Sequence, residues 1–152
     1  MTETIVKSSA PAATPVKRPP QVVITTWRGD QEFDSAKPGV PGIHIDSHGK
    51  KGPGPVEVLL AAMASCAATD VVEILAKRRT PVATLEVETI GTRAESVPRR
   101  LVHALMKFRI TGEGIERIHA ERAIELAIHK YCSVEASLDP NLPVEWELEL
   151  KS

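Results

Sequence analysis

The segment GPGPVEVLLAAMASCAATDVVEIL, residues 52–75, decides the fold, and it holds one cysteine, Cys66, within an almost wholly apolar run. Pro55 suits the first turn of a helix and Pro81 stops one, so the pattern predicts a helix over residues 56–79. The centre of this helix is apolar on nearly every face and must therefore be covered on nearly every face. Because one small sheet covers only one side, we expect another subunit to cover much of the rest.

Outside this segment, short runs of alternating or β-branched residues predict strands. The run over residues 101–111 alternates apolar and polar residues, and it is predicted to form an antiparallel hairpin with residues 82–90. The sequence VEWELEL near the C-terminus alternates with period two, which is typical of a strand with one buried face. The predicted strands cover residues 22–27, 31–35, 43–46, 82–90, 101–111 and 144–150, and an amphipathic second helix covers residues 115–130.

Length and composition indicate one folded domain. The chain has 152 residues, of which residues 1–20 are rich in Pro, Ala, Ser and Thr and are expected to form a flexible tail before the domain at residues 21–152. A net charge of -1 and an aromatic content of 3% give no basis for a nucleic-acid partner. The best candidate for a membrane span, residues 56–68, is too short and contains Glu57, and the tail lacks an apolar signal region. We therefore expect a cytoplasmic protein without a membrane partner.

The two cysteines, Cys66 and Cys132, allow two interpretations. Neither belongs to a CxxC pair, and the spacing typical of structural zinc is absent, so we expect no metal and no cofactor. A cysteine in an alanine-rich helix is most simply a small core residue. A redox role needs a thiolate, which an apolar setting disfavours, and a second thiol to close a disulfide. Since the two cysteines lie 66 positions apart, only the fold can bring them within disulfide range.

Two motifs carry a resemblance to a known family. Residues 52–75 match its helix with a Pro-x-Glu-Leu-like start, an Ala-Ala pair and a cysteine, and AIHKYCSVEASL, residues 127–138, matches its second cysteine motif. The chain resembles the OsmC/Ohr family (osmotically inducible protein C and organic hydroperoxide resistance proteins) over residues 22–150. The resemblance implies an α+β OsmC-like fold in which two antiparallel sheets wrap around long central helices of an intertwined homodimer.

The resemblance also implies an activity. Characterised members are thiol peroxidases that reduce organic hydroperoxides, and they are regenerated by a dithiol. By position, Cys66 matches the peroxidatic thiol and Cys132 matches the resolving thiol. The expected partners are therefore a second copy of the chain, an organic hydroperoxide substrate and a cellular dithiol reductant.

The first departure from the family pattern concerns an arginine that holds the thiolate and polarises the peroxide in peroxidatic members. Alignment of TTWRGDQEFDS, residues 25–35, places Phe33 at that position. Arg28 is near in sequence, but strand side chains alternate, so an odd displacement directs Arg28 to the other face. The sequence therefore resembles the OsmC-like branch that lacks the usual N-terminal arginine.

The second departure concerns the glutamate that pairs with this arginine. In the family it follows the proline directly, whereas here Val56 follows the proline and Glu57 comes one place later. Glu57 and Cys66 lie on opposite faces of the predicted helix, about 13 Å apart along it. A catalytic Glu57 would thus act only across a dimer interface. The alternative is a first-turn glutamate that favours the helix dipole.

Other polar groups near the cysteines have simpler interpretations. Asp70 and Glu73 lie near the helix face of Cys66 but would oppose formation of a thiolate, so polar pairing at the end of the helix is favoured for them. His129 precedes Cys132 by one turn, and it is expected to face solvent rather than to transfer protons.

Three interpretations of the function follow as hypotheses. The first is a thiol peroxidase that reduces organic hydroperoxides in defence against oxidative stress. The alternative is a non-peroxidase OsmC-like dimer that binds a small apolar ligand or senses oxidation, since the missing arginine leaves Cys66 poorly activated. A third interpretation is a stress-associated structural dimer with inert cysteines.

Overall fold

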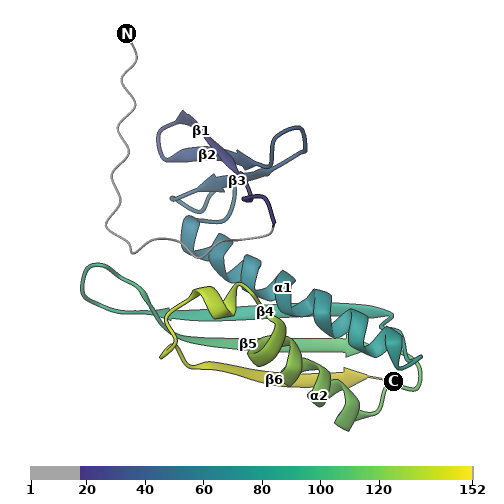
Figure 1. The fold of residues 1–152 in the computed structure, drawn as a ribbon. Coiled ribbons are helices and arrows are strands. Elements are labelled where there is room, and N and C mark those ends of the chain that lie inside the picture. Colours follow the sequence, from purple (N-terminus) through teal and green to yellow (C-terminus); the bar gives the residue numbers. More distant parts are fainter. Residues whose placement is uncertain (1–17, 152) are drawn as a thin grey trace.

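The structure, a computed structural model, describes residues 18–151. The predicted tail at residues 1–20 falls outside the described residues except for its last three. Figure 1 shows an N-terminal sheet, a long helix that leads away from it, and a second sheet that carries a shorter helix. The elements in chain order are β1 (Ile24–Gly29), β2 (Glu32–Ala36), β3 (Ile43–Asp46), α1 (Pro55–Lys77), β4 (Thr84–Arg93), β5 (Leu101–Thr111), α2 (Arg117–Leu126), the π-helical turn η1 (Ala127–Tyr131), the 3₁₀ turn η2 (Glu135–Ser137) and β6 (Val144–Lys151).

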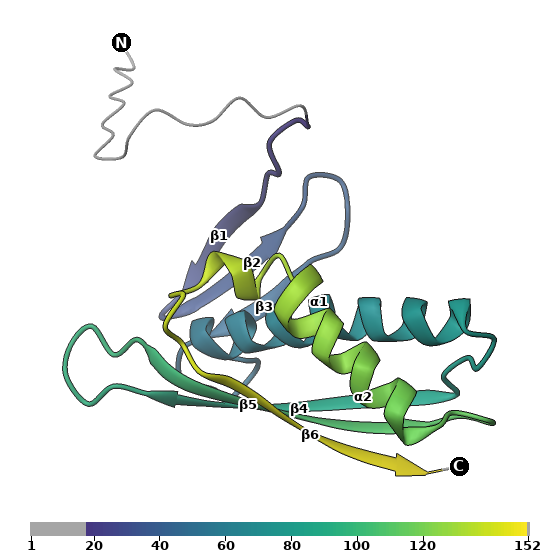
Figure 2. The ribbon, with the colours of Figure 1, turned by 60° about the horizontal axis from the view of Figure 1, so that its bottom comes forward.

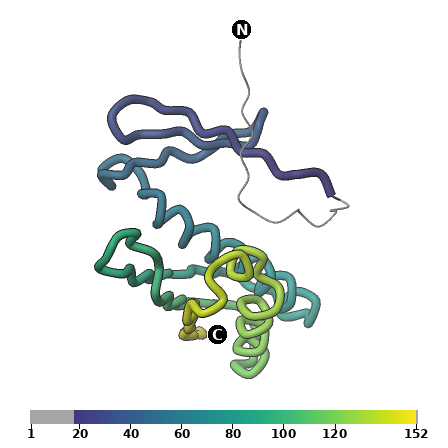
Figure 3. The backbone as a smooth tube through the Cα atoms, turned by 60° about the vertical axis from the view of Figure 1, so that its left-hand side comes forward, coloured from purple at the N-terminus to yellow at the C-terminus, as the bar shows by residue number. Residues whose placement is uncertain are grey.

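Strands β1, β2 and β3 form an antiparallel sheet whose two faces differ in chemistry. Trp27 lies opposite Phe33, and Phe33 lies opposite Ile45, so one face carries an apolar row across three strands. Asp34 and His44, which also lie opposite each other, point to the second face because side chains alternate along a strand. Trp27 is 64% exposed, so its own chain leaves much of this row uncovered. Figures 1 and 3 show this sheet apart from the second one and connected to it through α1.

Helix α1 has 23 residues, and its bounds agree with the prediction of residues 56–79 to within two positions. Its buried residues recur every fourth position and form one stripe: Met63, Ala67, Val71 and Leu75. Full burial of a valine, leucine or methionine side chain stabilises a fold by about 1.5–3 kcal/mol. The other faces of α1 are exposed or half-buried, and Val72 is 41% exposed. A single chain therefore leaves most of this apolar helix uncovered.

By length and composition, α1 is also sufficient to cross a membrane. The expectation that the apolar stretch is too short is therefore wrong, because the helix stays apolar well beyond residue 68. Length and composition alone are weak grounds for a membrane span, since the core helix of a folded domain passes the same test. The buried stripe of α1 shows that α1 is a core helix of this folded domain.

Strands β4, β5 and β6 form the second sheet. The predicted antiparallel hairpin is confirmed, with Thr84 opposite Thr111 at its open end. The expectation of two antiparallel sheets is wrong for this one, because β6 pairs with β5 in parallel from Ala104–Val144 to Thr111–Lys151. The chain passes through α2 between these strands, and such a crossover returns it to the same end of the sheet, as parallel pairing requires. The α+β class and the presence of two sheets are confirmed.

Both helices pack on one face of the second sheet, as Figure 2 shows. The predicted alternation in β5 is confirmed, since Ala104, Met106, Phe108 and Ile110 are buried. They meet the buried stripe of α1 and a buried set from α2 and η1. That set consists of Ala120, Ala123, Ile124, Ala127 and Ile128. The core thus lies between one sheet and two helices, and it leaves the N-terminal sheet outside.

The second helical segment, α2 with η1, ends within one residue of its prediction but differs at its start and in its last turn. It begins at Arg117 rather than residue 115, because Glu116 has extended backbone angles and serves as the N-cap. Regular α-helix ends at Leu126 and gives way to the wider π-helical turn, η1. Such turns add one residue to the helical hydrogen-bond repeat and occur frequently at functional sites. Cys132 follows η1 directly, with extended backbone angles of φ -67° and ψ 101°.

Candidate thiol site

Cys66 lies in the middle of α1, three positions after Met63 and one before Ala67, both of which are buried. Its side chain is half-buried and packs against the hydrophobic core without entering it fully. The thiol is free. This environment leaves part of the sulfur-bearing side chain accessible to another molecule.

Cys132 occupies a different environment and is only 3% exposed. Its Sγ lies 4.0 Å from the carbonyl oxygen of Met63, to which the thiol donates a weak hydrogen bond. Met63 belongs to the turn of α1 that precedes Cys66. The backbone N–H of Glu135 donates a hydrogen bond of 3.3 Å to the same sulfur. Cys132 is therefore fixed between α1 and the start of η2.

The surroundings of Cys132, which include Cys66, change the pKa of its thiol. Burial raises the pKa of the Cys132 thiol, and the hydrogen bond from the Glu135 N–H opposes this change. The adjacent Cys66 thiol raises the pKa of Cys132 further, while the Val134 N–H lowers it by a smaller amount. The structure thus brings together the two cysteines that the sequence separates by 66 positions. Both the redox interpretation of Cys66 and its interpretation as a core residue are compatible with this juxtaposition, because both cysteines belong to one core cluster.

Glu57 has a defined local role in its own chain. Its Oε2 accepts a hydrogen bond of 2.6 Å from the backbone N–H of Gly54, which forms a capping interaction at the start of α1. This is the arrangement in which a third-position glutamate satisfies a donor that the helix leaves free. Glu57 thus lies in the first turn and caps it in its own chain, while a catalytic role across a dimer interface stays a prediction. The structure does not bring Glu57 together with Cys66.

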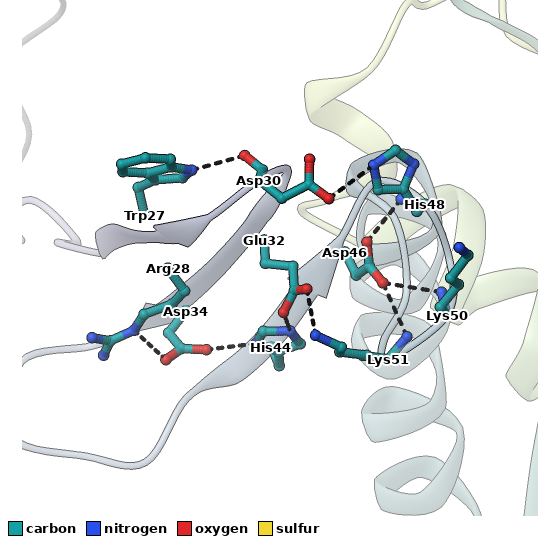
Figure 4. Close-up of polar contacts among 10 residues, drawn as sticks. All are labelled: Trp27, Arg28, Asp30, Glu32, Asp34, His44, Asp46, His48, Lys50 and Lys51. Carbon is teal, nitrogen blue, oxygen red and sulfur yellow. Dashed lines mark hydrogen bonds and ion pairs between the residues drawn. The ribbon is translucent and has the colours of Figure 1, made fainter.

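Arg28 and Phe33 lie on opposite faces of the N-terminal sheet, as the alternation predicts. The Nε of Arg28 donates a hydrogen bond of 2.6 Å to Asp34, which Figure 4 shows beside His44. Phe33 belongs to the apolar row with Trp27. Within one chain, Arg28, the arginine nearest the position of the family's catalytic arginine, is thus bonded to Asp34 on the polar face of the sheet.

Two of the remaining candidates, His129 and Glu73, lie where the simpler interpretations place them. His129 is exposed, and Glu73 forms an exposed ion pair of 3.4 Å with Lys77 at the end of α1. Asp70 is half-buried on α1. Among residues 18–151, no group of three or more histidine, cysteine or acidic residues is arranged to hold a metal ion.

A charged cluster on the N-terminal sheet was missed by sequence reasoning. His44 lies between two carboxylates, with Nδ1 2.7 Å from Asp34 and Nε2 3.1 Å from Glu32, and Lys51 donates a hydrogen bond of 2.6 Å to Glu32 (Figure 4). Hydrogen bonding to Asp34 raises the pKa of His44, and hydrogen bonding to Lys51 lowers the pKa of Glu32. The signal was present in the sequence as polar residues at every second position of β2 and β3, which places them on one face.

Asp46 organises the loop between this sheet and α1. It is 2% exposed, and its carboxylate accepts hydrogen bonds of 2.8, 3.0 and 3.0 Å from the backbone N–H groups of His48, Lys50 and Lys51 (Figure 4). These bonds lower the pKa of Asp46. Gly52 lets the loop pass close to β3, since a Cβ there would lie 2.6 Å from the backbone oxygen of His44. The loop thereby sets how the sheet joins α1.

A shallow apolar groove runs along α1 and β4. Most of its lining side chains are small or branched and apolar: Ala61, Ala64, Ala68, Val72, Leu85 and Val87. The polar lining residues are Ser65, Thr69 and Glu73. The groove lies on the part of α1 that its own chain leaves uncovered. Its chemistry suits a hydrocarbon group or another apolar protein surface.

Two sheets, a long apolar helix with a central cysteine, and a second buried cysteine beside it define a thiol-bearing α+β protein. The chain belongs to the OsmC-like protein family, whose model matches residues 47–147. The match includes both cysteines and ends within β6.

Comparison with individual proteins agrees with this assignment. Protein YhfA of Escherichia coli strain K12 is 36% identical over 102 residues, which cover 67% of this chain and 76% of that protein. A hypothetical protein from Aquifex aeolicus VF5 is 29% identical with a TM-score of 0.75, over 89% of this chain and 100% of that chain. The organic hydroperoxide resistance protein OhrB of Bacillus subtilis has a TM-score of 0.58 at 17% identity, over 86% of this chain and 98% of that chain. At that identity, OhrB shows a shared fold.

Proposed function

We propose that this protein is a thiol-dependent peroxidase that reduces organic hydroperoxides in defence against oxidative stress. The observation that carries the proposal is that Cys132 Sγ contacts the turn of α1 that precedes Cys66, which places a buried thiol in the same core cluster as a half-buried one. An accessible thiol suits attack on a substrate, and a protected neighbour suits resolution of the oxidised product. Membership of the OsmC-like family and the fold shared with an organic hydroperoxide resistance protein support the same chemistry.

The proposed reaction has three steps. The Cys66 thiolate attacks the terminal oxygen of the hydroperoxide, the O–O bond breaks, and the alkoxide takes a proton and leaves as an alcohol. Cys66 then carries a sulfenic acid. The Cys132 thiolate attacks its sulfur, the S–O bond breaks, and hydroxide leaves as water after protonation. A cellular dithiol reduces the resulting disulfide by exchange and becomes a disulfide itself.

The active unit in this proposal is a homodimer. Two apolar surfaces support it: the row on the N-terminal sheet that includes the 64% exposed Trp27, and the uncovered faces of α1. Exposed apolar surfaces of this kind mark interaction sites. Glu57 enters the reaction in this proposal only across the dimer interface, because its carboxylate caps α1 in its own chain.

Light scattering tests the dimer. Wild-type protein is expected at twice the chain mass of 16.5 kDa, and Trp27→Glu is expected to dissociate it by placing a charge in the apolar row. Val97→Glu is the matched control, because Val97 is 89% exposed in the turn between β4 and β5, far along the chain from that row. A wild-type monomer, or equal dissociation of both variants, contradicts the proposal.

Turnover of cumene hydroperoxide with dithiothreitol as the reductant tests the activity. Cys66→Ser is expected to abolish turnover, because serine cannot form the sulfenic acid. Cys66→Ser and wild-type protein are compared at equal folded concentration, which circular dichroism establishes. Equal turnover in the two proteins would exclude Cys66 as the nucleophile.

The second candidate is a non-peroxidase protein that binds a small apolar ligand or senses oxidation. Engagement of Arg28 with Asp34 and the apolar groove along α1 and β4 favour it. A pH titration of Cys66 alkylation separates the two functions. A thiol pKa well below the ordinary value of about 8.5 supports the peroxidase, and one near or above it supports the second candidate. A cytoplasmic location belongs to both proposals, since a reducing compartment returns the thiols to their free form.

A further inference from the structure

The two cysteines differ in how an external thiol can reach them. Cys132 is 3% exposed, enclosed by the turn of α1 that holds Met63 and by the residues that follow η1. Cys66 is half-buried, so part of this residue is exposed in a single chain. Thiol–disulfide exchange requires a thiolate to approach the sulfur that it attacks, so access decides which sulfur is attacked. A disulfide between them would therefore offer only the Cys66 sulfur to a reductant.

Attack at the Cys66 sulfur makes Cys132 the leaving group. The surroundings of Cys132 are unfavourable for a thiolate. Burial raises the pKa of Cys132, and a thiol with a raised pKa leaves more slowly. Cys132 also lies at the C-terminal end of the helix formed by α2 and η1, where the helix dipole is negative. The leaving sulfur thus needs compensating donors.

The start of η2 provides these donors. The Glu135 N–H donates a hydrogen bond of 3.3 Å to Cys132 Sγ, and the Val134 N–H acts on the same sulfur in the same direction. Hydrogen bonds from N–H groups stabilise a charged acceptor more than a neutral one. The donors therefore matter most at the moment when the sulfur carries the negative charge.

We propose that reduction of the disulfide is directional: an external dithiol attacks Cys66, and Cys132 leaves as a thiolate held by the Glu135 backbone N–H. In the first step, a thiolate of the dithiol bonds to the Cys66 sulfur, the bond between Cys66 and Cys132 breaks, and its electron pair stays on Cys132. In the second step, the other thiolate of the dithiol attacks its own mixed-disulfide sulfur, and Cys66 leaves as a thiolate. Two protons from the dithiol restore both protein thiols, and the dithiol becomes a cyclic disulfide.

The inference deepens the proposed function and rests on it for its physiological meaning, but its test needs no peroxide. Diamide oxidises two neighbouring thiols to a disulfide directly, so the oxidised protein can be prepared whether or not the protein is a peroxidase. Lack of peroxide turnover would then contradict only the proposed function. Failure of diamide to join Cys66 and Cys132 would overturn the directional mechanism.

The decisive comparison is Glu135→Pro against Glu135→Ala in diamide-oxidised protein. Proline removes the N–H donor, whereas alanine keeps it and removes the same side-chain carboxylate. Reduction by dithiothreitol is expected to be about threefold to tenfold slower in Glu135→Pro than in Glu135→Ala, with a larger ratio at lower pH, where a poorly stabilised thiolate leaves least readily. Equal rates in the two folded variants would overturn the role of this N–H group.

Proline at position 135 also disfavours the helical backbone of Val134, so a second measurement stands independently of this variant. Diamide-oxidised wild-type protein is mixed with glutathione and quenched in acid within seconds, and the cysteine-containing peptides are mapped by mass spectrometry. Glutathione is expected on Cys66, with Cys132 as a free thiol. Glutathione predominantly on Cys132 would overturn the directional mechanism.

Discussion

Cys132 Sγ lies 4.0 Å from the backbone oxygen of Met63, so the buried thiol contacts the turn of α1 that leads to Cys66. This contact joins two segments that carry the family's cysteine motifs and that are far apart in the sequence. The pair is asymmetric, since Cys66 is half-buried in a single chain while Cys132 is only 3% exposed. The predictions below concern this pair and the polar interactions that hold α1 and the N-terminal sheet in place.

Cys132→Ser is expected to preserve the first oxidation step and to block the second. Because the chain has 2 cysteines, Cys66 then keeps its sulfenic acid after one equivalent of cumene hydroperoxide. Dimedone trapping followed by mass spectrometry measures it, with at least about tenfold more adduct than in wild-type protein. Wild-type protein serves as the control, because its disulfide removes the sulfenic acid. An adduct of equal yield in both proteins would show that Cys132 does not resolve Cys66.

Glu57→Ala is expected to lower the free energy of unfolding by about 1 kcal/mol, because the Gly54 N–H loses its capping acceptor. Urea denaturation measures this loss. Glu73→Ala is the matched control on the same helix, because its exposed ion pair with Lys77 stabilises little. Glu57→Gln should retain most of the stability. If Glu57→Ala and Glu57→Gln both abolish peroxide turnover while they remain folded dimers, Glu57 acts in the reaction as well as in the cap.

Asp46→Asn is expected to lower the melting temperature at pH 7 by roughly 4–8 °C, because three backbone N–H groups lose a charged acceptor. The pKa of Asp46 is lowered in the folded protein, so its contribution to stability is present above the ordinary aspartate pKa of about 3.9. That contribution is lost as the pH falls through the folded pKa. Thermal melts from pH 7 to pH 2.5 should therefore show the two proteins converging. Asp30→Asn, in an exposed pair with His48, is the control, and a larger loss in that variant would contradict the assigned role.

His44 is expected to titrate above the ordinary histidine pKa of about 6.5, because Asp34 and Glu32 stabilise its charged form. A group whose pKa is raised on folding contributes stability that is fully present below its unfolded pKa. This contribution disappears as the pH rises through the folded pKa. Titration of the His44 ring by nuclear magnetic resonance measures the midpoint, and Asp34→Asn should move it to lower pH. An unchanged midpoint in Asp34→Asn would show that the hydrogen bond between His44 and Asp34 is not the main cause of the raised His44 pKa.

Much of the local structure could be predicted from the sequence. Helix α1 was predicted within two residues at each end, since prolines bound it and its composition is apolar throughout. The alternation in β5 predicted which of its residues are buried, because a period of two is a property of any strand. Prediction was less accurate at the second helix, because local periodicity does not reveal that the helix changes to a π-helical turn after Leu126.

The arrangement of the strands was predicted only in part. The β4–β5 hairpin joins neighbouring segments and was correct. The parallel pairing of β6 with β5 was not predicted. That pairing depends on the path of the chain through α2 and not on the pattern within either strand. The charged cluster around His44 was missed for a similar reason, since it forms only when β2 and β3 align in one register.

By itself, the sequence determined the apolar helix around Cys66, the strands, the resemblance to the OsmC/Ohr family and the displacement of Glu57 from the family position. These features are encoded locally, by residues within a turn or a strand of each other. The tertiary structure decided that Cys132 contacts α1, that Cys66 stays accessible, and that Glu57 and Arg28 are engaged elsewhere in their own chain. Packing of α1 against η1 sets the relationship of the two cysteines, because residues 66 positions apart meet only when the core between them forms.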